Sequence, residues 1–265
     1  IEQIITRCSI QIVFADQKYE SLLAGVKVLS SQPVDITHSD MSFHSHIPKD
    51  ECAVIIFTSG STGVKKGVML THKNLIANTN SILQYLNLSS DDRMMVVLPF
   101  FYCYGASLLH THIRVGGSLV LNQSPFLGGA LKGIHEFQCT GFAGVPSTFL
   151  ILVQKTPFLT MRFPSLRYLT QAGGHLACSV IHEIARTFAD KKFFVMYGAT
   201  EATARLSYLP PEFLFKKPDS IGKGIPGVTL EVRGKDGKKV KPGEVGEIVA
   251  AGDNIMAGYL EDPDE

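Results

Sequence analysis

The sequence has few cysteines and almost no net charge, and both shortages exclude classes of protein. Its five cysteines lie at least 36 positions apart, so no CxxC or CxxH pair predicts a zinc site or a disulfide framework. We expect reduced, mostly buried thiols in a cytoplasmic protein. The formal net charge is +1 in 265 residues, which gives no general attraction for nucleic acid or for an anionic membrane. With 45% hydrophobic and 18% charged residues, the chain is not intrinsically disordered.

No signal peptide is visible in this sequence, and we expect no transmembrane segment in it. The uncharged stretch Met94–Ile113 has the 20-residue length of a bilayer span, but Pro99 and Gly105 interrupt it. It is more typical of a strand, a turn and a buried helix. The chain starts at Ile1 without an initiator methionine or a basic leader, and we expect it to be a piece of a longer protein.

Short apolar runs alternate with helical patterns along most of the chain. The runs that we expect to form buried strands are Ile10–Phe14, Val54–Phe57, Met94–Leu98, Ser118–Leu121, Gly141–Ala143 and Phe193–Met196. Helical spacing follows Thr71, a good N-cap residue, and recurs over Val180–Phe188. This alternation predicts an α/β fold with mostly parallel sheets flanked by helices.

The distribution of charge suggests three parts. The last 61 residues carry 20 charged side chains, whereas residues 93–204 carry 13, so the tail is the more exposed part. In the tail, a Lys235-Asp236-Gly237 turn separates two apolar runs and predicts a hairpin. We therefore expect residues 1–92 to end a first α/β subdomain, 93–205 to form a second, and 206–265 to begin a small β-barrel-like subdomain.

The strongest local signal is the loop Thr58–Gly67, which follows the apolar strand ending at Phe57 directly. Its glycines allow the backbone to approach an anion, its hydroxyls and amides can cradle phosphate oxygens, and Lys65 and Lys66 supply charge. It is not a Walker A motif, so a P-loop kinase or ATPase is a poor reading. A flexible linker is a weaker explanation, because linkers rarely continue directly from such a strand.

A second signal follows the strand Phe193–Met196, where Tyr197, Gly198, Thr200 and Glu201 occupy the next loop. Ligands of α/β sheets bind at the carboxyl ends of strands. The tyrosine can stack on a base, and the carboxylate is a suitable Mg²⁺ ligand. Alone, this segment fits an ordinary exposed loop equally well. Together with the first loop it predicts a nucleotide site.

These two loops, with Gly246–Ile248 and Gly258–Leu260, resemble three core motifs of the AMP-forming adenylating enzymes. That superfamily includes acyl- and aryl-CoA synthetases, adenylation domains of nonribosomal peptide synthetases and beetle luciferases. The motifs occur in the family's order, and the resemblance covers essentially the whole chain. It implies ATP, Mg²⁺ and CoA as participants.

The resemblance also implies roles for individual residues. The residues expected to bind the ATP phosphates are Thr58, Ser59, Gly60, Ser61, Thr62 and Gly63, with Lys66 as the motif's lysine. Tyr197 and Gly198 would contact adenine, Thr200 would hold the α-phosphate, and Glu201 would bind Mg²⁺. Lys66, Thr200 and Glu201 are thus the expected catalytic residues. The segment Gly173-Gly174-His175 resembles the family's glycine-rich turn beside the adenine and acyl pockets.

The candidate acyl-binding residues are Tyr102, Tyr104, Gly105 and Gly174. The segment that holds the first three matches a further family motif imperfectly, because many acyl- and aryl-CoA ligases carry His at the position of Tyr102. Both tyrosines fit plain core packing equally well. No acidic residue lies between Arg93 and Glu136, which argues against an α-amino acid substrate, since a buried ammonium needs a partner.

The implied reaction joins a small-molecule carboxylic acid to ATP as an acyl-adenylate and then transfers the acyl group to a thiol, of CoA or of a carrier protein. The family's Thr-Gly-Asp segment and C-terminal catalytic lysine do not occur here, so we expect an inactive central fragment of such a ligase. One alternative is a non-catalytic nucleotide-binding relative, and another is an adenylation domain that loads a carrier protein. The full gene sequence would decide among them.

Overall fold

The computed structural model describes residues 2–15, 19, 23, 26–30, 47–59 and 65–262. They belong to two compact units, Ile1–His46 and Ile47–Glu265. The first unit contains the helix α1 (Glu2–Arg7) and the parallel strands β1 (Ile12–Ala15) and β2 (Lys27–Ser30). The prediction of a buried strand over Ile10–Phe14 is wrong about burial, because Phe14 is 76% exposed on this two-stranded ribbon. The three predicted subdomain boundaries stay a prediction.

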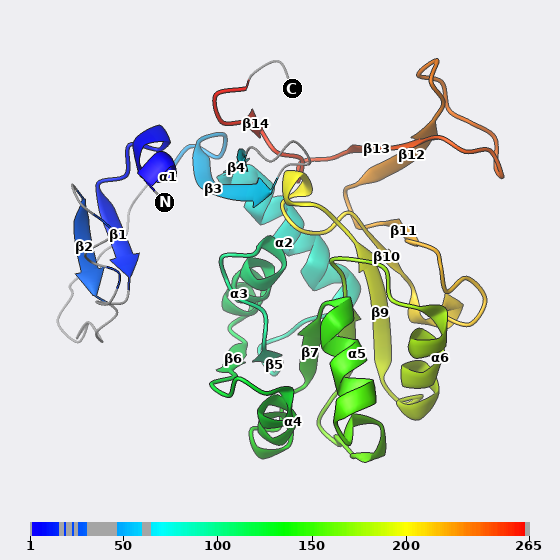
Figure 1. Cartoon of the computed structure of the whole chain (residues 1–265). Helices are drawn as coiled ribbons and strands as arrows, with labels where there is room; N and C mark the ends of the chain where they lie inside the picture. The colour runs from blue at the N-terminus through cyan, green and yellow to red at the C-terminus, as the bar shows by residue number, and fades with distance from the viewer. Residues whose placement is uncertain are drawn as a thin grey trace. The chain divides into compact units, whose positions relative to one another are not determined.

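A seven-stranded sheet in the order β11-β10-β9-β8-β7-β5-β6 organises the second unit (Figure 1). Its strands are β5 (Arg93–Val96), β6 (Ser118–Leu121), β7 (Gly141–Gly144), β8 (Tyr168–Gln171), β9 (Lys192–Tyr197), β10 (Ser207–Leu209) and β11 (Lys223–Gly224). The strands β5 to β9 are parallel, whereas β10 and β11 are antiparallel additions at one edge. The predicted α/β class with a mostly parallel sheet is therefore confirmed.

Helices cover both faces of this sheet. They are α2 (His72–Leu86), α3 (Cys103–Val115), α4 (Leu127–Glu136), α5 (Pro146–Lys155) and α6 (Cys178–Thr187), with 3₁₀ turns η2 (Phe158–Thr160), η3 (Thr200–Ala202) and η4 (Pro211–Phe213). Strand residues alternate between two hydrophobic clusters: Phe193 packs with α4, α5 and α6, and its neighbour Phe194 packs with α2 and α3. Burial on both faces is why central strands such as β5, β7 and β9 are nearly continuous apolar runs. The edge strand β6 is only half-buried, so the prediction of a buried strand over Ser118–Leu121 is wrong about burial.

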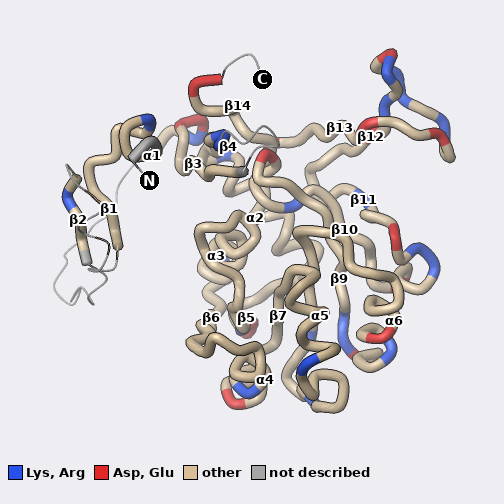
Figure 2. Tube along the Cα trace, in the orientation of Figure 1, with Lys and Arg blue, Asp and Glu red and all other residues tan. Residues whose placement is uncertain are grey.

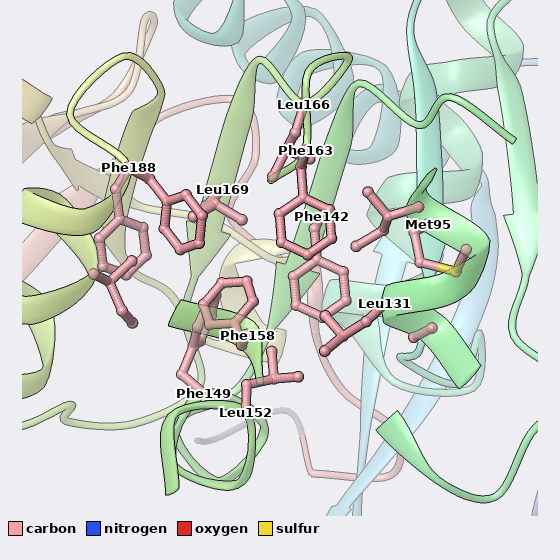
Figure 3. Packing of buried hydrophobic residues seen from close by; sticks show 14 of the residues in the cluster. Met95, Leu131, Phe142, Phe149, Leu152, Phe158, Phe163, Leu166, Leu169 and Phe188 are labelled. Carbon is pink, nitrogen blue, oxygen red and sulfur yellow. The ribbon is translucent and has the colours of Figure 1, made fainter. Parts of the chain in front are cut away.

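The cluster on the α4–α6 side is rich in phenylalanine (Figure 3). The rings of Phe142 and Phe149 meet edge to face at 6.0 Å, and Phe158 packs against Phe188 at 4.8 Å. Phe142, Phe149 and Phe158 are completely buried. Interlocked rings of this size hold sheet and helices in one arrangement, which gives the loops at the strand ends a rigid base.

The start of α2 confirms the predicted N-cap. The backbone N–H of Asn74 donates to the Thr71 hydroxyl at 3.1 Å, while the Thr71 N–H donates to the Asn74 side chain at 2.8 Å. This reciprocal capping box satisfies two N–H groups that the first turn leaves unpaired. At the other end, Asn87 adopts a left-handed conformation (φ 52°) that ends the helix.

The described residues of the second unit also form two smaller antiparallel sheets. The strands β3 (Cys52–Ser59), β4 (Lys65–Thr71) and β14 (Gly258–Tyr259) pair in the order β14-β4-β3. The strands β12 (Thr229–Arg233) and β13 (Glu247–Ala251) form the hairpin that was predicted from its turn. In Figure 2, residues of both charges colour the end of this hairpin, while fewer charged residues colour the main sheet and its helices.

The segment Met94–Ile113 has the predicted composition of strand, turn and buried helix, since it contains most of β5 and α3. Over the described residues, no helix combines the length and apolar character that crossing a bilayer requires. The strand β8 and the helices α4 and α5 were not among the elements predicted from the sequence.

Candidate functional site

One cavity of the second unit lies where β8 and β9 end, and we call it the main cavity because it gathers most of the sequence-predicted site residues. It has a volume of about 410 Å³. Its walls are Tyr102–Tyr104, Gln171–Leu176, Val195–Thr200 and Pro218–Ile221, with Ile181 and Ala204. The sequence-predicted site residues that line it are Tyr102, Tyr104, Gly173, Gly174, His175, Tyr197, Gly198 and Thr200. Three segments far apart in the sequence thus meet at the carboxyl ends of parallel strands, where ligands bind in such sheets.

The turn after β8 is built around two glycines. Gly173 has φ +87° and Gly174 φ +157°, both in the region that side chains rarely adopt. A Cβ on Gly173 would lie 2.8 Å from the hydroxyl oxygen of Tyr102, so this tyrosine packs directly against the turn. The Gln171 amide donates to the Gly174 carbonyl at 2.8 Å and braces the turn from inside. The turn therefore leaves backbone, not side chain, facing the cavity.

The loop after β9 is equally constrained. A Cβ on Gly198 would overlap the carbonyl oxygen of Ala204, so only glycine fits. Beyond η3, Thr203 takes a positive φ of 70°, and its hydroxyl donates to the Asn254 carbonyl at 2.7 Å. Tyr197 keeps 38% of its surface exposed at the cavity. The loop holds an aromatic face ready to stack on a planar ligand.

Thr200 and Cys103 both line the main cavity, and their side chains are in contact. The Thr200 hydroxyl donates to the Cys103 sulfur at 3.5 Å. Burial raises the pKa of the Cys103 thiol, which keeps it neutral and weakly nucleophilic. All five cysteines are free, but only Cys103 and Cys139 are buried, so the prediction of mostly buried thiols is wrong. The sequence pattern gave no reason to place Cys103 at the site.

Glu201 lies beside the cavity and is tied to β14. The Tyr259 hydroxyl donates to its carboxylate at 2.9 Å, and the Met256 N–H donates to its carbonyl at 2.8 Å. The Lys66 ammonium lies 5.0 Å from the centre of the Tyr259 ring. Pairing of Tyr259 with Val68 on β4 makes this possible. Tyr259 thus connects the lysine of the first loop with the carboxylate of the second.

The phosphate loop itself is only partly described. Gly60, Ser61, Thr62 and Gly63 lie outside the described residues. On either side of them, Thr58 pairs with Lys66 and Ser59 with Lys65 in antiparallel register, so the loop connects the two strands of a hairpin. This register sets two hydroxyls directly opposite two lysines, a suitable base for an anion-binding loop.

The strand that leads into this loop is less buried than predicted. Val54–Phe57 is half-buried, because β3 is the edge strand of its sheet in the part of the chain that the structure describes. One of its faces borders a second cavity of about 650 Å³, whose other walls include Leu75 of α2 and Ser107 of α3. The predicted buried strand is therefore an open edge.

Gly105 does not line the main cavity. It lies in α3, where a Cβ would overlap the Pro99 carbonyl oxygen, so it allows the helix to pack closely on the preceding turn. Lys66, Glu201, Thr58 and Ser59 also lie outside the cavity wall itself. The structure gathers the adenine-loop and glycine-turn residues in one place and holds the lysine and the carboxylate next to it.

Asp219 is a cavity residue that no sequence motif indicated. It accepts hydrogen bonds from the Cys178 thiol at 2.7 Å and from His175 at 3.3 Å, and these lower the pKa of its carboxyl group. The same contact raises the pKa of Cys178. The absence of acidic residues between Arg93 and Glu136 disfavours an ammonium-bearing substrate only as far as that segment forms the cavity. The structure adds an acidic group to the cavity rim from a different segment.

The donor set suits Mg²⁺ better than a metal held entirely by protein. No cluster of three or more His, Cys, Asp or Glu side chains occurs among the residues that the structure describes. Mg²⁺ commonly takes one or two carboxylates, with substrate phosphates and waters as its remaining ligands. Glu201 fits this pattern, because only the Tyr259 hydroxyl donates to its carboxylate within the described part of the chain.

The family model of the AMP-binding enzymes matches residues 1–260. The chain belongs to this family.

Its relatives are acyl- and aryl-CoA ligases. The chain is 32% identical over 248 residues to 2-succinylbenzoate–CoA ligase of Bacillus velezensis, covering 93% of this chain and 49% of that protein. It is 33% identical over 221 residues to feruloyl-CoA synthase of an Amycolatopsis species, covering 81% and 44%. The chain spans about half the length of the curated relatives it matches.

A solved structure supports the same fold. O-succinylbenzoate CoA synthetase of Bacillus subtilis, in complex with ATP and magnesium ion, matches with a TM-score of 0.83 and 25% identity, covering 97% of this chain and 54% of that one. The described part of the chain therefore has the fold of an adenylate-forming enzyme, and the resemblance inferred from its motifs is confirmed.

Proposed function

We propose that this chain supplies the nucleotide and carboxylate sites of an AMP-forming acid–thiol ligase. The whole protein would join a carboxylic acid to the α-phosphate of ATP, releasing pyrophosphate, and then transfer the acyl group from AMP to a thiol. CoA is the proposed acceptor, because the relatives are named CoA ligases. The observation that carries this proposal is the meeting of the Gly173–Gly174 turn, the Tyr197–Thr200 loop and Tyr102 around one cavity.

Each segment has a distinct task in this proposal. Tyr197 stacks on adenine, and the tight turn at Gly198 allows the base to approach the backbone. Thr200 donates a hydrogen bond to the α-phosphate. The β3–β4 hairpin, with Lys66 at its base, holds the β- and γ-phosphates. Tyr102 and Tyr104 form the wall that the acyl chain contacts, and burial raises the pKa of both, so they remain neutral hydroxyls.

The chemistry depends on electrostatics. A carboxylate must approach a phosphate that carries its own negative charge, so oriented donors and cations have to offset the repulsion. Mg²⁺ bound at Glu201 would neutralise phosphate charge and orient the leaving group. Tyr259 keeps the Glu201 carboxylate in one place by its hydrogen bond. The hydrophobic cluster between the sheet and the helices α2 and α3 is rigid, and it keeps these groups in fixed positions.

The test uses a non-hydrolysable mimic of the acyl-adenylate, a 5′-O-(N-acylsulfamoyl)adenosine, titrated into the 265-residue chain by calorimetry. We expect saturable binding that adenosine alone reproduces only weakly, because the mimic fills both halves of the site. The absence of binding would contradict the proposal. An ATP–pyrophosphate exchange assay on the whole protein then separates a ligase from a non-catalytic nucleotide-binding relative, which binds the mimic but exchanges no pyrophosphate.

A further inference from the structure

The core of the second unit contains a buried arginine that has no acidic partner. Arg205 lies between η3 and β10 and is 1% exposed. No carboxylate forms an ion pair with it anywhere in the described stretches 47–59 and 65–262. The buried acid Asp92 is engaged by Arg167 at 2.7 Å and is not available to it. A buried charge without a counter-charge is costly and therefore requires an explanation.

Only some of the N–H groups of this guanidinium have hydrogen-bond acceptors among the described residues. Its Nη1 donates to the Tyr85 hydroxyl at 2.8 Å, and its Nη2 reaches the Ser107 hydroxyl at 3.5 Å. Its Nε is buried and has no hydrogen-bond partner. The carbon at its centre lies 5.1 Å from the centre of the Tyr104 ring. A guanidinium offers five N–H donors in a fork that matches a carboxylate, and here most of them are unused.

The guanidinium lies one layer behind the wall of the main cavity. Tyr104, which it contacts, lines that cavity, and so does Ala204, the residue just before Arg205. The Tyr104 hydroxyl forms a 2.7 Å hydrogen bond with Thr170, and its ring packs within the buried cluster on the α2 and α3 side of the sheet. A ligand arm that displaces the Tyr104 ring would meet the unused N–H groups.

We propose that the carboxylic acid substrate carries a second, distal anionic group, such as another carboxylate, which pairs with Arg205. This inference rests on the proposed function, since it concerns the acyl end of the same cavity. An entering carboxylate would accept hydrogen bonds from the unpaired Nε and from a terminal nitrogen, in the bidentate geometry that arginine favours. It would also supply the counter-charge that the core lacks. The substrate class is thus a dicarboxylic acid or a comparably anionic acid.

The experiment compares matched acylsulfamoyl adenosines that differ only in the distal carboxylate. Succinyl, glutaryl and adipoyl arms are each paired with the unsubstituted arm of equal carbon number. In calorimetry on the parent chain, at least one adenosine with a carboxylated arm should bind about tenfold more tightly than the adenosine with the unsubstituted arm of equal carbon number. This is the gain expected for a charge-assisted hydrogen bond in a buried site. The unsubstituted arms measure the binding that remains without the distal carboxylate.

Three variants assign the preference to Arg205. Arg205→Met removes the charge at similar volume and should abolish the preference, while binding of the unsubstituted arms stays within about threefold of the parent's. Arg205→Lys keeps the charge without the fork and should leave an intermediate preference. Arg114→Met, the same change at an exposed arginine of α3, should have no effect. Thermal unfolding of each variant shows whether it is folded.

The outcomes are distinguishable. If no arm binds at all, the proposed function fails and this inference fails with it. If the carboxylated and unsubstituted arms bind equally at every length, Arg205 is a structural cation, and the inference is wrong while the proposed function stands. A preference that persists in Arg205→Met also overturns it. If Arg205→Met does not fold, the preference for carboxylated arms is compared between the parent and Arg205→Lys. An equal preference in both proteins would then overturn the inference.

Discussion

The hydroxyl of Tyr259 donates a 2.9 Å hydrogen bond to the carboxylate of Glu201, 58 positions earlier in the chain. The same tyrosine ring lies under the Lys66 ammonium at 5.0 Å. One residue of the short strand β14 therefore joins the two loops that the sequence assigns to phosphate and to magnesium. This relationship suggests that the last motif of the chain positions the carboxylate.

Tyr259→Phe should weaken the binding of Mg·ATP to the chain by about fivefold, because a typical hydrogen bond contributes about 1 kcal/mol net. Binding of ATP in the presence of a chelator should change much less, since the effect acts through the carboxylate that faces the metal. Calorimetric titrations with and without Mg²⁺ measure both. Tyr208→Phe is the matched control, because the Tyr208 hydroxyl has no hydrogen-bond partner within the described residues. Equal losses with and without Mg²⁺ would disprove a positioning role.

Glu201→Gln keeps the size of the side chain and removes its charge. In the whole protein we expect the rate of ATP–pyrophosphate exchange to fall on the order of 10²-fold, since a charged metal ligand is lost from the phosphate site. The affinity for the carboxylic acid should change little, because Glu201 does not line the main cavity. An unchanged exchange rate would remove Glu201 from the mechanism.

Gly198→Ala should distort the loop that carries Tyr197. The added methyl would overlap the Ala204 carbonyl oxygen, and overpacking of this kind typically costs about 1–3 kcal/mol. Both the unfolding temperature and the affinity for adenylate mimics should fall. The matched control is Gly128→Ala in α4, where a Cβ meets no atom within 4 Å. That change should leave stability unaltered or raise it by up to about 1 kcal/mol. Similar behaviour of the two variants would show that the Gly198 turn is not constrained.

Asp92 and Arg167 provide a test of stability against pH. Burial raises the pKa of Asp92, but hydrogen bonds from Arg167, Ser89 and Thr140 outweigh it and bring the pKa below its ordinary value. A lowered folded-state pKa stabilises the protein above the unfolded value near ~4, and this stabilisation is lost as pH falls through the folded pKa. Asp92→Asn should therefore cost about 2 kcal/mol near neutral pH, reduced from a fully buried pair because the Arg167 side chain is 35% exposed.

The difference in unfolding free energy between parent and Asp92→Asn should shrink as the pH is lowered toward ~3. Urea titrations at several pH values measure this. Asp91→Asn, at the neighbouring exposed position, should have little effect at any pH. A difference that grows toward acid pH would contradict the assignment.

Much of the fold could be predicted because it follows from local pattern. Buried strands such as β7 and β9 are continuous apolar runs, and the α2 cap depends on Thr71 and its near neighbour Asn74. The helix α4 escaped prediction because Gly128 and Gly129 at its start are more typical of a loop. The burial of β3 was overestimated because an edge strand and a central strand can have the same apolar composition.

The site residues also fall into those that a local motif predicts and those that it does not. Tyr197, Thr200 and Glu201 are close in sequence and form a recognisable motif, so they could be identified together. Asp219 reaches the cavity from a segment without a motif, and the sequence around Cys103 is typical of an ordinary core residue. The isolation of Arg205 is visible only when every nearby carboxylate has been placed. Contacts between distant segments, which no local pattern encodes, determine these three positions.

The most direct test of the account is a crystal structure of the chain with an acylsulfamoyl adenosine bound. We expect the adenine ring to stack on Tyr197 within about 4 Å, the usual contact distance of packed rings, with the acyl arm directed toward Tyr102 and Tyr104. A structure with the adenine bound away from Tyr197 and the Gly173–Gly174 turn would contradict it.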